Sequence, residues 1–257
     1  ALVAGASYAG YTLAAKRMSP ARFGLWSGII LSIGNIGMLL SSSPLAFVVE
    51  QWGWRAGFWI SACFGAVVAV AVFALVPKQP AEQADRSSPL LQMAEVLRIG
   101  LSRQLRGLIA LSLVSLAASL VLRGLWGGPW LMEIKALSRI EAGNTLGLFT
   151  LALIAGPVLM GILDRTIGHR REVLAAARSF AALLLAVMAA GAPHYPLADL
   201  LGVAAIPARF DAVLFVLIGI AISTQPLLYG MTRQLVDAQN AGKALSAINL
   251  AFFLGAA

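Results

Sequence analysis

Cysteine and charged residues are scarce in this chain of 257 residues. Cys63 is the only cysteine, so no disulfide can form within the chain and a small disulfide-stapled fold is excluded. Charged residues make up 12% of the sequence, far below the roughly 25% that is usual in a soluble domain. The hydrophobic share of 60% is too high for a disordered chain. Both a soluble globular protein and a disordered one are therefore excluded, and the bilayer remains as the solvent.

Long apolar runs, bounded by charged or turn residues, fill most of the sequence. A bilayer core about 30 Å thick is crossed by about 20 helical residues. Eight runs approach this length, at 1–15, 24–49, 56–76, 107–130, 143–163, 173–191, 212–232 and from about 244 to the end. Such runs predict helices and not the short alternating strands of a barrel. The predicted fold is all-α, a polytopic transmembrane helical bundle, and we expect a fragment truncated at both ends because both ends are apolar.

The Lys and Arg residues are distributed unevenly over the predicted loops. The segments 16–23, 77–106, 164–172 and 231–243 hold thirteen of them, and the alternate segments hold four. Cytoplasmic loops collect Lys and Arg, so the first set is predicted to be cytoplasmic. The formal net charge of +8 therefore reflects topology, and we expect the lipid bilayer and no nucleic acid among the partners.

Residues 77–106 form the longest predicted loop and divide the chain into three parts. The loop begins with a Pro-rich polar linker and continues in a pattern typical of a short amphipathic helix on the membrane surface. Its apolar face holds Leu90, Leu91, Ala94, Leu97 and Leu101, with Arg98, Arg103 and Arg106 opposite. We expect helical domains at 1–76 and 107–257 on either side of this linker.

Two motifs and the loop pattern resemble the major facilitator superfamily. Gly53-Trp54-Arg55 with Phe58 is similar to the family's motif before span six. The run from Gly161 to Arg171 is similar to its Gly-x-Leu-x-Asp-Arg-x-Gly-Arg-Arg loop between spans eight and nine, with one extra residue between Asp164 and Gly168. The resemblance implies two pseudo-symmetric six-helix halves joined by a long cytoplasmic loop. It numbers the spans of this chain as four to eleven of twelve.

A narrower resemblance concerns the branch of the superfamily. The run from Gly124 to Trp130 with Glu133, and the run from Asn249 to Gly255, look like a bacterial branch labelled nitrate/nitrite-porter-like. The run from Gly34 to Met38 lacks the Gly-Pro-x-x-Gly-Gly pattern of drug antiporters, which argues against proton-drug antiport.

The charged loop after Gly161 is a candidate gate. Asp164 and Arg165 end one predicted helix, and Arg170 and Arg171 precede the next, with Gly168 between them. These charges can pair across helix ends and with helix dipoles in one transport state and separate in the other. The alternative is that the arginines only contact lipid headgroups and fix the topology. The resemblance favours the gate.

Arg123 is the strongest candidate for contact with a substrate. It lies about 24 Å along its predicted span, in the outer third of the membrane. An arginine inside a membrane is costly and is by default functional, most simply as the counter-ion of an anion. The alternative is a side chain that reaches the outer headgroups. In the superfamily that the chain resembles, spans one, four, seven and ten line the cavity, which favours the substrate for Arg123 on span seven.

Other polar residues inside spans are weaker candidates. Tyr8 and Tyr11 share a helix face on span four, and Gln225 precedes a proline that frees a backbone carbonyl on span ten. Asn35 and Asn249, on spans five and eleven, contact either a substrate or a neighbouring helix. Trp126 and Trp130 flank Gly127-Gly128-Pro129, a predicted helix break that is either a flexible gate or an aromatic belt position.

The sequence predicts transport and no chemistry. None of the predicted spans has Asp or Glu in its interior, and no nucleotide-binding loop, metal-ligand cluster or nucleophile pattern is present, so we expect no enzyme, cofactor or metal. We expect a monomeric secondary active transporter of the bacterial inner membrane that moves a small molecule or ion by alternating access. An anion is favoured because of Arg123. The alternative is a sensor or scaffold of the same fold that does not transport.

Overall fold

The computed structural model describes residues 20–40, 43–75, 88–193, 199–200, 202, 206–237 and 239–255, and these residues form helices joined by short turns. Five of the described segments are long and apolar enough to cross a membrane, which confirms the predicted all-α, multi-pass fold. The helices are α2 (Pro20–Leu40), α3 (Ser43–Leu75), α4 (Pro89–Gly100), α5 (Arg106–Leu120), α6 (Gly127–Pro129), α7 (Arg139–Ile167), α8 (Arg170–Ala190), α10 (Ala208–Ile222), α11 (Gln225–Leu235) and α12 (Ala241–Leu254), with two π-helical stretches, η1 (Val121–Trp126) and η2 (Trp130–Ile134).

The chain divides into two compact units, each described here by itself. The larger unit contains residues 1–35 and 94–257, and the smaller unit contains residues 36–93. The first part of α2 therefore belongs to the same unit as the helices that follow the linker. The predicted domain bounds 1–76, 77–106 and 107–257 stay a prediction.

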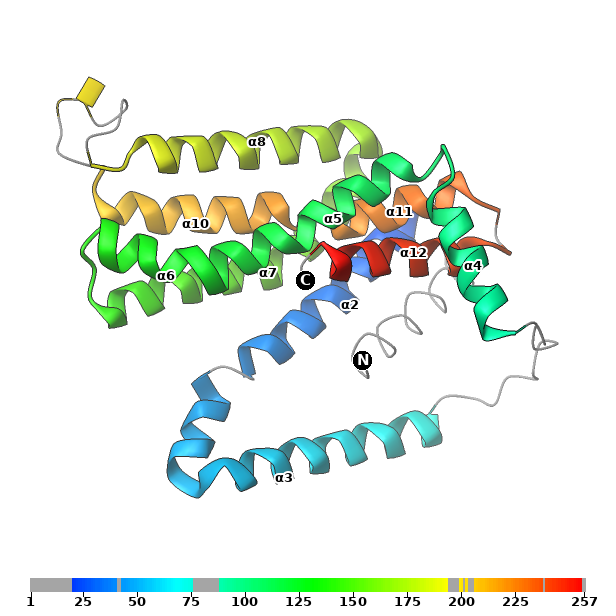
Figure 1. Ribbon diagram of the computed structural model, residues 1–257, viewed down its shortest axis with the longest axis horizontal. Helices are drawn as coiled ribbons and strands as arrows, with labels where there is room; N and C mark the ends of the chain where they lie inside the picture. The colour runs from blue at the N-terminus through cyan, green and yellow to red at the C-terminus, as the bar shows by residue number, and fades with distance from the viewer. Residues whose placement is uncertain are drawn as a thin grey trace. The chain divides into compact units, whose positions relative to one another are not determined.

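In the larger unit, α10 packs along both α7 and α8, and α12 packs along α5 (Figure 1). Small residues make these approaches possible, as expected where apolar surface alone does not drive helices together. A Cβ added to Gly219 of α10 would lie 2.8 Å from the Cβ of Ala152 on α7. The close α7–α10 contact therefore depends on a missing side chain.

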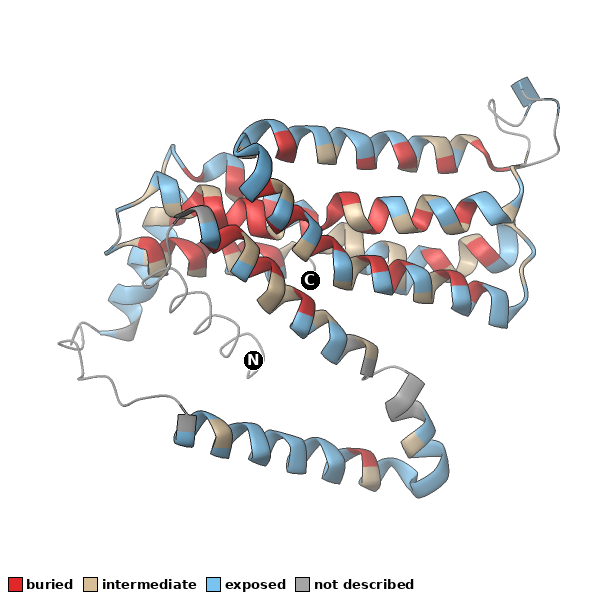
Figure 2. Cartoon of the chain, turned by 180° about the vertical axis from the view of Figure 1, so that it is seen from behind, coloured by how far each residue is buried: buried red, intermediate tan, exposed pale blue. Residues whose placement is uncertain are grey.

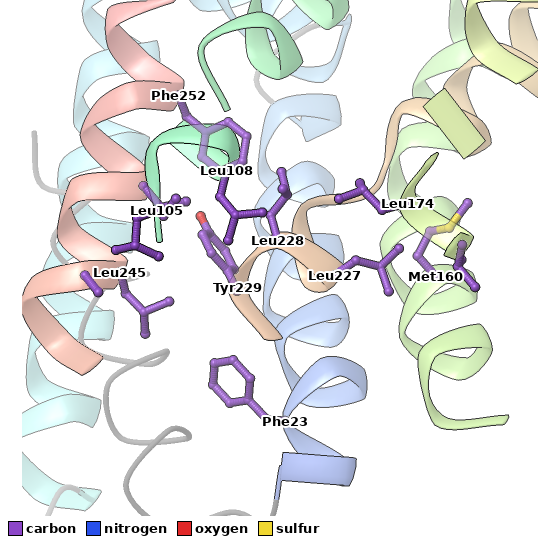
Figure 3. Close-up of a cluster of buried hydrophobic side chains, with 13 residues drawn as sticks. Phe23, Leu105, Leu108, Met160, Leu174, Leu227, Leu228, Tyr229, Leu245 and Phe252 are labelled. Atoms are coloured by element: carbon purple, nitrogen blue, oxygen red, sulfur yellow. The ribbon is translucent and has the colours of Figure 1, made fainter. Parts of the chain in front are cut away.

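The core of the larger unit consists of two apolar clusters. We call the end of this unit that carries Arg170, Arg233 and Lys243 the basic end. The first cluster lies toward the basic end and includes Phe23, Leu105, Leu108, Met160, Leu174, Leu227, Leu228, Tyr229, Leu245 and Phe252 (Figure 3). The second lies toward the opposite end and includes Leu131, Phe149, Ala181, Leu184, Met188, Phe215, Ile218, Ala221 and Ile222. Each cluster joins at least four helices, so together they hold the bundle along its length.

Capping residues explain where α7 begins and ends. Ser138 and Glu141 form a capping box, in which each side chain satisfies a backbone N–H of the other residue. At the other end, Gly168 has a φ of 72° and its N–H donates to the carbonyl of Asp164. The helix consequently extends beyond the predicted run 143–163 and places Asp164 in its last turn.

The segment after α5 stays helical through Gly127-Gly128-Pro129, where the sequence predicts a break. It widens into π-helix on both sides of this tripeptide, at η1 and η2. The widening has a physical reason, since Pro129 lacks an N–H and its ring excludes a carbonyl four residues earlier. The span predicted at 212–232, in contrast, is interrupted, because α10 ends at Ile222 and α11 begins at Gln225.

The smaller unit contains α3, whose side chains are mostly exposed (Figure 2). Gly53 has a φ of 77°, and the axis of α3 changes direction there, within the predicted outer turn at 50–55 (Figure 1). The described chain also departs from the prediction, because a new helix begins at Ser43 inside the run 24–49.

Candidate functional site

The first part of α2 contacts α7 backbone to backbone. Gly28 faces the carbonyl of Pro157, which leaves no room for a Cβ. A Cβ added to Gly161 would lie 2.8 Å from the Cα of Leu25, and Gly24 lies against the carboxylate of Asp164. Residues without side chains at positions 24, 28 and 161 therefore let two helices from distant parts of the sequence touch. We call this contact the α2–α7 seam.

Hydrogen bonds extend the seam toward the opposite end. The Ser32 hydroxyl donates to the carbonyl of Ile154 at 2.5 Å, and Asn35 Nδ2 donates to the carbonyl of Leu153 at 2.5 Å. Both acceptors belong to the turn of α7 that precedes Pro157, whose missing N–H leaves the carbonyl of Leu153 without its helical partner. Asn35, a candidate for substrate contact in the sequence, therefore bonds a neighbouring helix.

An ion pair closes the basic end of the seam. Asp164 is 3% exposed and accepts two hydrogen bonds from Arg170, from Nε at 2.5 Å and from Nη2 at 2.9 Å. Such a two-point contact between guanidinium and carboxylate is strong and fixes both side chains. Arg170 Nη1 also donates to the carbonyl of Gly230 on α11 at 3.4 Å. The pair thus joins α7, α8 and α11 at the point where Gly24 of α2 arrives.

The other motif residues have different surroundings. Arg165 and Arg171 are exposed, as expected of side chains that reach headgroups. Gly168 caps α7 and lets the chain turn toward Arg170. Arg233 on α11 lies over the ring of Phe23 on α2 at 5.1 Å, a cation–π contact that ties a second α11 residue to α2. Nothing in one sequence links Arg233 to Phe23, so this contact could not be predicted from the sequence.

Arg123 lies in the π-helical stretch η1 and is half-buried. Within the part of the chain that the structure describes, its guanidinium has no hydrogen bond or ion pair. π-Helical turns are frequent at functional sites because they displace a side chain from its usual direction. An unpaired arginine in an apolar span is able to bind an anion.

A second buried charge cluster lies at the opposite end of the larger unit. Lys135 Nζ donates to the carbonyls of Gly191 and Ile206, at 3.1 and 2.9 Å, and lies 3.4 Å from Asp211 Oδ2. Trp130 Nε1 donates to Asp211 Oδ1 at 3.0 Å. Both residues lie between the predicted spans, in segments 131–142 and 192–211, but both side chains are almost fully buried. This cluster anchors Trp130 to α10.

The remaining candidates are distributed over the described helices. Trp126 is 63% exposed, and Gln225 is half-buried at the first position of α11. Asn249 of α12 accepts a hydrogen bond from the Tyr229 hydroxyl at 3.4 Å, which joins α11 and α12. Tyr8 and Tyr11 lie outside the described residues. The structure therefore brings Asp164 together with Arg170, and Asn249 together with Tyr229.

The small residues along the seam could have predicted the contact between α2 and α7 from the sequence. Gly24 and Gly28 are four residues apart and share one helix face, a spacing typical of close helix contacts in membranes. Among the described residues, no group of three His, Cys, Asp or Glu side chains could hold a metal ion.

Comparison with known proteins identifies a family. A family model described as "Major Facilitator Superfamily" matches residues 1–257, the whole chain. No curated protein matches the sequence.

Proposed function

The chain belongs to the Major Facilitator Superfamily and is a multi-pass secondary transporter, and we propose that it moves a small anion by alternating access across a bacterial inner membrane. In this mechanism two groups of helices rock against each other around a central site. The solute crosses chemically unchanged. The charge asymmetry of the loops supports a cytoplasmic location for the basic end.

The observation that carries the proposal is the α2–α7 seam. Its glycine contacts and the Asp164–Arg170 pair hold α2 against α7, α8 and α11 at the basic end. Such a state closes the cytoplasmic side. Opening that side requires α2 to leave α7, which breaks the short glycine contacts and uncovers Phe23. A surface of glycine, serine and asparagine suits repeated separation and closure.

The solute class rests on Arg123. Its guanidinium lies in an apolar span and has no partner among the described residues. The cost of this charge in the membrane is offset when an anion binds it. Arg123 lies toward the end opposite the basic end, so an anion arriving from outside would meet it while the basic end is closed.

A reversible cross-link across the seam tests alternating access. Cys63 is the only cysteine, so Cys63→Ser gives a cysteine-free background for the double variant Ser32→Cys with Ile154→Cys, two positions that a hydrogen bond joins across the seam. Oxidation should lock the basic end and stop counterflow of radiolabelled anion in liposomes, and a reductant should restore it. The two single-cysteine variants serve as controls and should be unaffected by oxidation. Full counterflow in the cross-linked protein would contradict the mechanism.

Counterflow by the full-length protein also separates a transporter from a sensor or scaffold, because a scaffold exchanges nothing. With an anion that is exchanged, Arg123→Gln should raise the apparent KM at least about 10-fold through the lost charge-assisted hydrogen bonds. The exposed Arg209, at the same end of the bundle, provides the matched control Arg209→Gln, which should leave the KM unchanged. An unchanged KM in Arg123→Gln would reject the anion role.

A further inference from the structure

Arg178 is a second arginine inside an apolar helix, and its surroundings differ from those of Arg123. Its Nη2 donates to the hydroxyl of Ser115 on α5 at 2.5 Å, and its Nε is buried without a hydrogen-bond partner. The structure shows no carboxylate paired with it in the described part of the chain. Ser115 itself donates to the carbonyl of Leu111, so only its lone pair is left for the guanidinium. Arg178 therefore has unused donors in an apolar interior.

The depth of Arg178 places it near the middle of the membrane. It is the ninth residue of α8, about 12 Å from the start of a helix about 30 Å long. On α8 it lies between Leu174, which belongs to the cluster toward the basic end, and Ala181, which belongs to the other cluster. Arg178 thus occupies a polar layer between the two apolar clusters. Secondary transporters bind their solutes at this depth.

Two other helices place polar groups at the same level. Leu228 of α11 lies between Leu108 of α5 and Leu174 of α8 (Figure 3). One helical turn from these three leucines, in each case away from the basic end, the chain has Thr224, Ser112 and Arg178. The side chains of Ser112 and Thr224 are both fully buried. Each of the three helices therefore has a polar residue one turn beyond its leucine, on the side away from the basic end.

Thr224 is the residue that most needs a partner. It lies in the interruption between α10 and α11 and is 0% exposed, and its Oγ1 has no hydrogen-bond partner. A buried hydroxyl without a partner is costly, and natural structures rarely leave one without a reason. The interruption also directs the N-terminus of α11 into the polar layer, and helix N-termini at mid-membrane interruptions favour anions.

We propose that Arg178 and Thr224 form a mid-membrane site for a small oxyanion with two coplanar oxygens, such as a carboxylate or nitrate. Arg178 would donate from Nε and a terminal nitrogen to the two oxygens, a geometry that a guanidinium fits and an ammonium does not. Thr224 would donate its hydroxyl proton. This inference rests on the proposed transport of an anion and adds the place where the anion stops between the two sides. Arg123, nearer the outer end, then lies on the approach.

Anion binding to the full-length protein in nanodiscs tests the site without transport. Thermal unfolding is followed by tryptophan fluorescence in sodium acetate, sodium nitrate and sodium chloride at equal ionic strength. A ligand that binds the folded state raises the midpoint with its concentration, which yields an apparent Kd. Acetate and nitrate should stabilise the wild type more than chloride does. Arg178→Gln should raise the apparent Kd for acetate and nitrate about 10- to 100-fold, and Thr224→Val should raise it about 3- to 10-fold.

Further variants separate binding from a structural role. Ser115→Ala removes the contact that ties α8 to α5 but keeps the guanidinium, so the anion affinity should stay within about 3-fold of wild type, since a neutral hydrogen bond contributes about 1 kcal/mol. Arg178→Lys keeps the charge but loses the planar guanidinium that donates to two oxygens at once. Its anion affinity should lie between those of the wild type and Arg178→Gln. An equal loss of affinity in Ser115→Ala and Arg178→Gln would overturn the site. Thr224→Val decides the case if Arg178→Gln does not fold.

The two proposals fail in different ways. Equal stabilisation of wild type, Arg178→Gln and Thr224→Val by acetate and nitrate would overturn this site and leave transport untouched. The absence of any stabilisation of the wild type beyond that in chloride would overturn it as well. Conversely, binding that depends on Arg178 in a protein without counterflow would support the site and reject the transport mechanism.

Discussion

Helix α3 and the segment formed by α10 and α11 are almost equally apolar, yet they have opposite surroundings. In the most apolar stretch of α3, 6% of the residues are buried, against 61% in the most apolar stretch of Ala208–Leu235. Figure 2 shows the difference as a nearly continuous exposed surface on α3 and a mixture of buried, intermediate and exposed residues on α10. Apolar composition therefore indicates that a helix crosses the membrane and says little about which helices it touches.

The difference between the two segments lies in their small and polar residues. Apolar side chains gain little from leaving lipid for protein, so close packing and interhelical hydrogen bonds decide which helices associate. The α10–α11 segment has Gly219 against α7 and Asp211 bonded to Trp130 and Lys135. Within the described residues, no added Cβ on Gly53 or Gly65 of α3 would meet another atom within 4 Å. The comparison leads to matched pairs of substitutions.

The largest expected effect is the loss of a buried charge partner. Lys135→Ala should destabilise the protein by about 3–5 kcal/mol, because Asp211 would stay buried without its cation. The matched change on α3, Arg55→Ala, removes an exposed side chain that lies 4.5 Å from the ring of Trp54 and should be barely measurable. Unfolding in mixed micelles gives both free energies. Equal costs for the two variants would contradict the assignment of a buried pair.

A smaller effect is expected from removing one phenylalanine in each segment. Phe215 is fully buried on α10, with its ring 5.6 Å from that of Phe149, whereas Phe64 on α3 is 70% exposed. Phe215→Ala should lower the free energy of unfolding by about 2–3 kcal/mol, which is less than in a water-soluble protein. The cost of the cavity left by the ring remains, but the gain from keeping apolar atoms out of water largely disappears in lipid. Phe64→Ala should change the unfolding free energy little, and a comparable loss would show that α3 is packed against protein.

Glycine substitutions probe the same comparison on a finer scale. Gly219→Ala should cost about 1–2 kcal/mol, because the new methyl group would meet Ala152 and Phe149 of α7. Gly65→Ala on α3 has free space and should be neutral or stabilising by up to about 1 kcal/mol, since alanine favours a helix more than glycine does. The sign of the Gly65 effect is the informative readout, and a clear loss of stability there would count against an open surface.

The smallest perturbation is the labelling of the native thiol. Cys63 lies on α3 and is exposed, so it can be modified without a substitution. If the exposed surface of α3 faces lipid, the thiol stays protonated there, so a lipid-soluble maleimide should react slowly and a charged, membrane-impermeant one should hardly react at all. The ratio of the two rates, measured by mass spectrometry in intact membranes, checks the surroundings of α3. Fast reaction with the impermeant reagent would place Cys63 in water.

The sequence predicts the elements of this fold better than their contacts. Hydropathy locates helices such as α7 and α8 to within a few residues, because about 20 apolar residues are needed to cross the membrane. Asp164 and Arg170 could be grouped because one turn separates the helices that carry them. Lys135 with Asp211, and Arg178 with Ser115, could not, since their pairing depends on the rotation and register of helices far apart in the chain. One sequence does not contain that information.

The wide π-helical turns between Val121 and Ile134 change the direction in which all later side chains of this segment point. A π-helical turn accommodates one residue more than an α-turn, so every later side chain is rotated relative to an undisturbed helix. Removing one residue from η1 would turn the rest of the segment by about 100°. Trp130 would then point away from Asp211, to which its indole nitrogen now donates. The length of this segment, as well as its residue types, therefore determines which side chains reach α10.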